Sequence, residues 1–176
     1  MSTEPITATL PEPTQMSIEQ RLTEAGVKLG FQVREQIGAS ESAWVDLVWF
    51  DGGLPVPDKG FNMHDTPALP VVGFEIEHHT ALNAKHVKGS VSNLNNLGAQ
   101  LGIIVIGRPN LTALESREPW KGKDDKALKH ELRNRAFRWI YAEAQPRVRI
   151  NVMFEDDVER WIDSLKAHTQ ARAAAV

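Results

Sequence analysis

The spacing of hydrophobic and polar residues predicts four helices and five strands. Apolar residues recur at helical intervals in residues 14–29, 83–98 and 124–144, and in a last helix that runs through Leu165. Thr14 is the expected N-cap of the first helix, Gly30 its expected end, and Asp156 or Asp157 the expected cap of the last. Alternating or wholly apolar runs predict strands at residues 31–37, 43–50, 71–78, 101–106 and 147–154.

The order of these elements predicts an α/β protein with a mixed central sheet and helices on both faces. Residues 1–13 contain three prolines and are expected to form a flexible lead-in. A single domain is expected over 14–168, followed by an Ala-rich tail at 169–176. Turn and loop residues interrupt the pattern at 38–42, 51–70 and 108–123. The sequence contains no internal repeat.

Composition narrows the classes of protein that fit. The 176 residues are 41% hydrophobic and 24% charged, which is typical of a globular domain, and no apolar run is long enough to cross a bilayer. Cysteine is absent, which excludes disulfides and thiolate chemistry. The first residues lack the features of a secretory signal, so we expect a cytoplasmic protein. The net charge of −3 means that nucleic-acid binding would require a local basic face.

Three acidic residues stand out in the predicted strands. Asp46 is the only charge in its strand, where an ionised carboxylate is costly unless it is paired, at an edge or bound to a cation. Glu75 and Glu77 are two residues apart, so both side chains project from one face and repel each other. Together the three carboxylates predict a site for Mg²⁺ or Mn²⁺. The alternative is a solvated sheet face, or pairing of the two glutamates with Arg34 on a neighbouring strand.

The segments WVDLVWF and VVGFEIEHHTALNAKHVKGSVSNLNNLGAQLGIIVIG resemble the PD-(D/E)xK, or restriction-endonuclease-like, nuclease superfamily. The similarity extends from about Met16 to Gly107 and implies an αβββαβ core. It also implies that Asp46 and Glu75 bind the metal, that the backbone carbonyl of Ile76 is a further ligand, and that Glu19 is an accessory acid on the first helix.

The sequence departs from the family pattern at two places. No proline precedes Asp46, and Glu77 occupies the position of the family's lysine, as it does in some restriction enzymes of the superfamily. The FEIE form also resembles restriction-type and helicase-associated proteins with Phe-Glu-Val-Glu. Alternatively, Lys85 or Lys88 on the following helix takes the place of the lysine.

A basic segment follows the region of resemblance. Lys121, Lys123, Lys126 and Lys129 are candidates for contacts with nucleic-acid phosphates. The alternative is a solvated helix with internal pairs, Asp125 with Lys129 and Glu131 with Arg135. Three further expectations concern His79, which could share the face of Glu77, the asparagines 93, 95 and 96, which could contact DNA or cover a polar surface, and the tryptophans 44, 139 and 161, which are expected to pack.

These observations predict a divalent-metal-dependent DNA endonuclease of the restriction or defence type. Asp46 and Glu75 would hold the ion, and Glu77, Lys85 or Lys88 would orient the attacking water. The alternative is a nuclease-fold module that no longer cuts and serves in DNA binding or assembly. The expected partners are DNA and a second copy of the chain in a homodimer, with membership of a larger complex as a third hypothesis and no membrane association.

Overall fold

The computed structural model describes residues 16–53 and 68–174, with side chains as far as Ala167. Its five strands form one mixed sheet in the order β1-β2-β3-β4-β5, antiparallel from β1 to β3 and parallel from β3 to β5. The predicted fold class is confirmed. The strands are β1 (Gln32–Ser40), β2 (Ala43–Phe50), β3 (Pro70–Glu77), β4 (Leu101–Ile106) and β5 (Arg149–Phe154).

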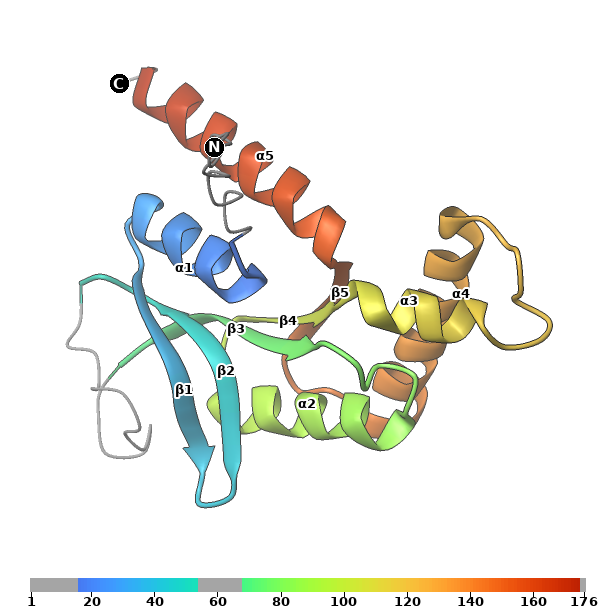
Figure 1. The fold of residues 1–176 in the computed structure, drawn as a ribbon. Coiled ribbons are helices and arrows are strands. Elements are labelled where there is room, and N and C mark those ends of the chain that lie inside the picture. Colours follow the sequence, from blue (N-terminus) through green and yellow to red (C-terminus); the bar gives the residue numbers. More distant parts are fainter. Residues whose placement is uncertain (1–15, 54–67, 175–176) are drawn as a thin grey trace, which may run out of the picture.

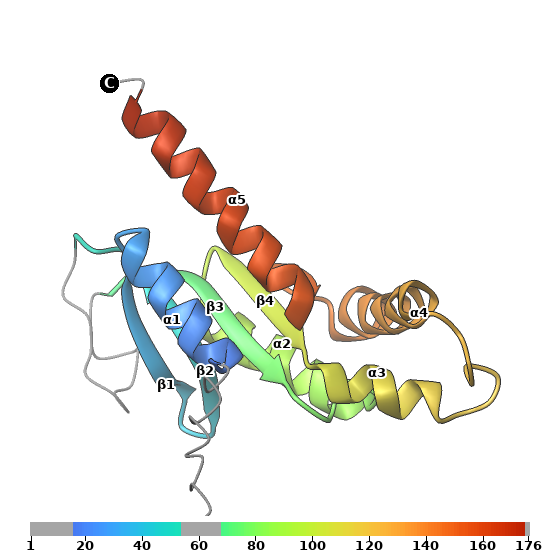
Figure 2. The ribbon, with the colours of Figure 1, turned by 45° about the horizontal axis from the view of Figure 1, so that its top comes forward.

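Helices cover both faces of this sheet (Figure 1). One core lies between the sheet and α1 with α5, and the other lies between the sheet and α2, α3, α4 and η2. Figure 2 shows α3 and α4 beyond the end of the sheet to which β3 and β4 point. The helices are α1 (Ile18–Lys28), α2 (Ala84–Leu97), α3 (Arg108–Glu115), α4 (Asp125–Phe137), the π-helix η2 (Arg138–Ala144) and α5 (Glu155–Ala174).

Local sequence explains where the helices nearest the site begin and end. Ser17 caps α1 and forms a capping box with Gln20. The expected cap Thr14 lies outside the described residues, as does the lead-in 1–13. Gly30 follows α1 with a φ of +88°, as expected for a residue that ends a helix. Asn83 caps the start of α2, and Gly98 ends it in the left-handed conformation.

Several elements differ from the prediction. The first strand continues to Ser40, so the expected turn at 38–42 shrinks to two residues. The stretch expected to be irregular contains α3, and the helix expected over 124–144 changes to π-helix at Arg138. The last helix begins at Glu155 rather than after an aspartate cap, and continues to Ala174 within the expected tail.

In β1 and β2, the side chains that face α2 change from one alternate set of residues to the other. The change occurs at two residues that lie opposite each other on the two strands. On β2, Val45 is in the core beneath α2, whereas Leu47 is in the core beneath α1. Residues two apart in a regular strand share a face, so the strand turns over between them, at Asp46. On β1 the same change occurs between Val33 and Ile37, where Gln36 has a φ of +51°. We call this paired feature the face reversal of Gln36 and Asp46.

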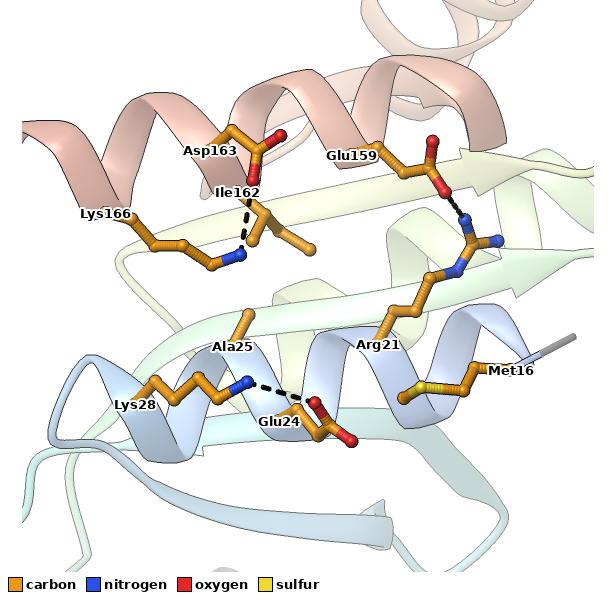
Figure 3. Close-up of a pocket in the computed structure, with 9 residues that line it drawn as sticks. All are labelled: Met16, Arg21, Glu24, Ala25, Lys28, Glu159, Ile162, Asp163 and Lys166. Carbon is orange, nitrogen blue, oxygen red and sulfur yellow. Dashed lines mark hydrogen bonds and ion pairs between the residues drawn. The ribbon is translucent and has the colours of Figure 1, made fainter.

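Helices α1 and α5 lie side by side on one face of the sheet (Figure 3). Arg21 of α1 pairs with Glu159 of α5, and a hollow of about 280 Å³ lies between the two helices. Ion pairs within each helix, Glu24 with Lys28 and Asp163 with Lys166, line this hollow. None of the described helices has both the length and the apolar character that crossing a membrane requires.

Candidate metal centre

The Asp46 carboxylate lies where β2 and β3 separate. The backbone pairing of these strands ends at Leu47 and Phe74. Beyond that point the side chain of Asp46 takes the place of a backbone acceptor between the two strands. Its Oδ2 accepts a hydrogen bond of 2.8 Å from the backbone N–H of Ile76. Its Oδ1 accepts one of 3.2 Å from Gln36 Nε2. The face reversal therefore turns this carboxylate toward the neighbouring strand.

Glu75 lies beside Asp46 on the adjacent strand. Continuing the register of β2 and β3 places the two residues opposite each other. The Glu75 side chain is 6% exposed, and its Oε1 has no hydrogen-bond partner among the residues that the structure describes. Burial, followed by the negative charge of Asp46, raises the pKa of Glu75 from 4.5 to about 9, although nearby Asn93 and Ser90 partly offset the rise.

The pair of carboxyl groups is electrostatically unfavourable when both are ionised. Burial also raises the pKa of Asp46, against the lowering effect of the hydrogen bonds from Ile76 and Gln36, and Glu77 and Glu19 add to the rise. A buried oxygen without a partner, next to a second carboxylate, is an arrangement that a cation relieves.

The donor set suits one cation better than others. Mg²⁺ is commonly held by one or two carboxylates, with waters and substrate phosphate completing its shell. The N–H and C=O of a strand residue point toward the same neighbouring strand, so the Ile76 carbonyl also faces the Asp46 side. Among the side chains that the structure describes, however, no three histidine, aspartate or glutamate residues are grouped in a metal-binding arrangement.

Glu77 does not join this pair as a third ligand. It is 8% exposed, and both carboxylate oxygens accept hydrogen bonds: Oε1 from Ser90 Oγ at 2.5 Å and Oε2 from Thr80 Oγ1. Ser90 belongs to α2, so Glu77 ties the end of β3 to that helix. In the position of the family's lysine, this glutamate therefore has a structural partner on each oxygen.

A buried asparagine that the sequence pattern did not single out holds the loop after β3. Asn110 of α3 is fully buried, and its Oδ1 accepts a hydrogen bond from the backbone N–H of Ala81 at 2.9 Å. Its Nδ2 donates to the carbonyl oxygens of Glu77 at 2.6 Å, His78 at 2.9 Å and Gly107 at 3.2 Å. Only its place in the first turn of a short helix that follows a strand could have indicated this role.

Glu19 lies next to the candidate centre and lines a small hollow. The hollow has a volume of about 170 Å³ and opens on the α1 side of the sheet. Glu19 Oε1 lies 2.8 Å from Nε2 of His78, and both His78 and His79 are exposed. The side chain of Glu75 lies on the α2 side of the sheet, near Asn93 and Ser90, and is not part of the lining of this hollow. The hollow is lined by Glu19, Glu35, Gln36, Asp46, Ile76 and His78.

The candidate lysines on α2 are not part of this hollow. Lys85 is exposed at the start of the helix, and Nζ of Lys88 pairs with Glu143 of η2 at 3.1 Å. Two of the asparagines on α2 have structural partners. Asn93 donates to the carbonyl oxygen of Trp44, and Asn95 accepts from the backbone N–H of Arg147.

The basic segment divides into exposed and paired lysines. Lys121, Lys123 and Lys126 are exposed. Nζ of Lys129 lies 2.8 Å from Asp156 and 3.2 Å from Asp125, and these acids raise the pKa of Lys129 although its partial burial lowers it. The expected pair of Asp125 with Lys129 is confirmed. So is the pair of Glu131 with Arg135, at 2.6 Å.

Comparison with protein-family models, with curated proteins and with solved structures finds no match for this chain. The α/β architecture with its mixed sheet is consistent with a nuclease-like core. The function therefore has to be argued from the chemistry of the site.

Proposed function

We propose that this protein is a divalent-metal-dependent endonuclease that hydrolyses phosphodiester bonds in DNA. The observation that supports it best is the buried Glu75 oxygen without a described partner, beside Asp46, where β2 and β3 separate. The αβββαβ order of the first six elements agrees with the PD-(D/E)xK resemblance.

Asp46, Glu75 and the carbonyl of Ile76 would hold Mg²⁺ or Mn²⁺. When bound there, the ion would polarise the scissile phosphate and lower the pKa of an attacking water. Gln36 and the N–H of Ile76 keep the Asp46 carboxylate in place by donating to its two oxygens. Glu19, whose Oε1 lies 2.8 Å from Nε2 of His78, lines the hollow and would accept a proton from a water there.

The second candidate is a nuclease-fold module that binds DNA or assembles with a partner without cutting. One observation favours it: both oxygens of Glu77 are hydrogen-bonded to serine and threonine hydroxyls, which leaves that residue poorly placed to activate water. The cleavage assay below separates the two candidates.

The deciding experiment is cleavage of supercoiled plasmid and of single-stranded DNA. The wild-type chain should cut in the presence of Mg²⁺ or Mn²⁺ and be inactive in EDTA. Retention of DNA binding with no cleavage in either ion would establish the second candidate in place of the first.

Binding of Mg²⁺ to the protein is expected to release close to one proton per ion at pH 7. With a pKa of about 9, Glu75 is protonated in the free protein and must ionise to act as a ligand. Isothermal titration calorimetry in two buffers of different ionisation enthalpy measures this release directly. Glu75→Gln should lose most of the affinity and the proton release together. Tight binding without proton release would show that the ion binds elsewhere.

Removing Lys121 and Lys123 together is expected to weaken DNA binding by a similar factor for all sequences. If each contacts one phosphate, the slope of log affinity against log salt should fall by roughly two units. The control is Lys28→Ala, whose ammonium pairs with Glu24 on α1. An unchanged slope in the double variant would mean that these lysines are only a solvated surface.

A further inference from the structure

Trp44 exposes its indole ring where the strand pattern predicted packing. It is 44% exposed, although Ala43 and Val45 on either side are buried. Both neighbours lie in the core beneath α2, so Trp44 points away from that helix. The hollow that contains Asp46 opens on the same side of the sheet, because α1 provides part of its lining. The packing expected for Trp44 is therefore wrong.

The backbone that carries this ring is held firmly. Asn93 of α2 donates a hydrogen bond of 3.1 Å to the carbonyl oxygen of Trp44. The residue opposite Trp44 in the β1–β2 register is Gly38. Cross-strand neighbours share a face, and a glycine there has no side chain to cover the indole. The ring is thus presented to solvent from a fixed strand.

The ring lies close to the candidate metal centre. Trp44 and Asp46 are two residues apart on an extended strand, which places their Cα atoms about 7 Å apart. A ligand that reaches both must carry an anionic group for a metal at the carboxylates and a flat apolar group for the indole. An unpaired nucleotide carries both, whereas the bases of a duplex are stacked on each other and do not offer a free face.

We propose that Trp44 stacks on an unpaired base of single-stranded DNA whose phosphate lies in the hollow at Asp46, an inference that rests on the proposed function. Stacking on an aromatic side chain is tolerant of base identity, so the contact would favour single strands without selecting a sequence. The substrate class of the site is therefore DNA that is single-stranded at the point of contact.

The test measures binding of the full chain to a labelled single-stranded oligonucleotide and to its duplex by fluorescence anisotropy in EDTA. Trp44→Ala should weaken single-strand binding by about 5- to 100-fold and leave duplex binding unchanged. Trp44→Phe should retain most of the affinity. The matched control is Tyr141→Ala, which removes an aromatic ring of 52% exposure on η2 and should change neither affinity.

Three results would overturn the inference. The first is that the wild type does not bind single-stranded DNA. The second is that Trp44→Ala loses affinity for single-stranded and duplex DNA equally. The last is that Trp44→Ala converts a dimer to a monomer while its affinity for DNA is unchanged. The last would make a second copy the occupant of this surface. Because binding is measured without metal, its outcome is independent of cleavage. If the wild type cleaves DNA but Trp44→Ala does not change single-strand binding, the stacking inference is refuted and the nuclease proposal stands. If Trp44→Ala weakens single-strand binding but the wild type does not cleave, only the nuclease proposal is refuted.

Discussion

Asp46→Asn is expected to reduce DNA cleavage by at least about 100-fold, a loss of the size seen when one group that stabilises charge in a transition state is removed. The amide keeps the size of the side chain, and its oxygen can still accept the hydrogen bond from Ile76. Its neutral head no longer provides the anionic ligand for Mg²⁺. Metal-free DNA binding should survive or tighten, because a negative charge facing the phosphates has been removed.

The matched control for Asp46→Asn is Asp51→Asn, the same exchange immediately after β2 and outside the hollow. Cleavage rates on plasmid and unfolding curves in urea should be measured for both variants. Cleavage at the wild-type rate in Asp46→Asn would remove this residue from the metal centre. Loss of folding in this variant would instead show that the ionised carboxylate has a structural role between Gln36 and Ile76.

The stability of the metal-free protein is expected to fall as the pH rises from about 4.5 to about 9, through the contribution of Glu75. The folded protein holds this proton with a pKa of about 9, against an ordinary value of 4.5. It therefore binds more protons than the unfolded chain within that window, and its stabilisation is complete only below it. One proton corresponds to a slope of up to about 1.4 kcal/mol per pH unit in the free energy of unfolding.

Urea unfolding at pH 6, 7 and 8 in EDTA measures this slope. Glu75→Gln should flatten it, so the variant gains stability relative to wild type as the pH rises. Mg²⁺ should restore stability at pH 8 to the wild type and not to the variant. The control is Glu24→Gln, whose carboxylate lies at the surface of α1. Parallel slopes for wild type and Glu75→Gln would contradict the buried, protonated state of Glu75.

The elements with strong apolar periodicity were predicted closely from the sequence, and those that depend on single polar contacts were not. β2 and β4 have the expected bounds, because their runs of apolar residues, interrupted only by Asp46 in β2, end at turn residues. Gly38-Ala-Ser was predicted as a turn from its composition, yet Ala39 is buried beneath α2 and the strand continues through it. Helix α3 is short and half of its residues are polar, so its pattern was too weak to detect.

The site shows the same division between pattern and tertiary contact. The spacing of Glu75 and Glu77 correctly predicted a shared face, since both approach α2. It could not predict that the hydroxyls of Thr80 and Ser90 would donate hydrogen bonds to both oxygens of Glu77. Nor could it predict that Glu75 Oε1 would have no hydrogen-bond partner among the described residues. The alternation of β2 also predicted the wrong environment for Trp44, because periodicity identifies two faces but not which part of a face a helix covers.

The face reversal of Gln36 and Asp46 also determines how the β1–β2 hairpin can change in length. With Asp46 held in place, a single residue inserted into β2 moves every side chain between the insertion and the turn to the opposite face. Between Asp46 and the turn, such an insertion would expose Ala43 and bury the indole of Trp44 beneath α2. Insertions or deletions of two residues in both strands keep the parity on each side of the reversal. The part of the hairpin between Gln36, the turn and Asp46 can therefore change in length only by an even number of residues in each strand. Within that limit its tip can be replaced while the Asp46 carboxylate stays in place.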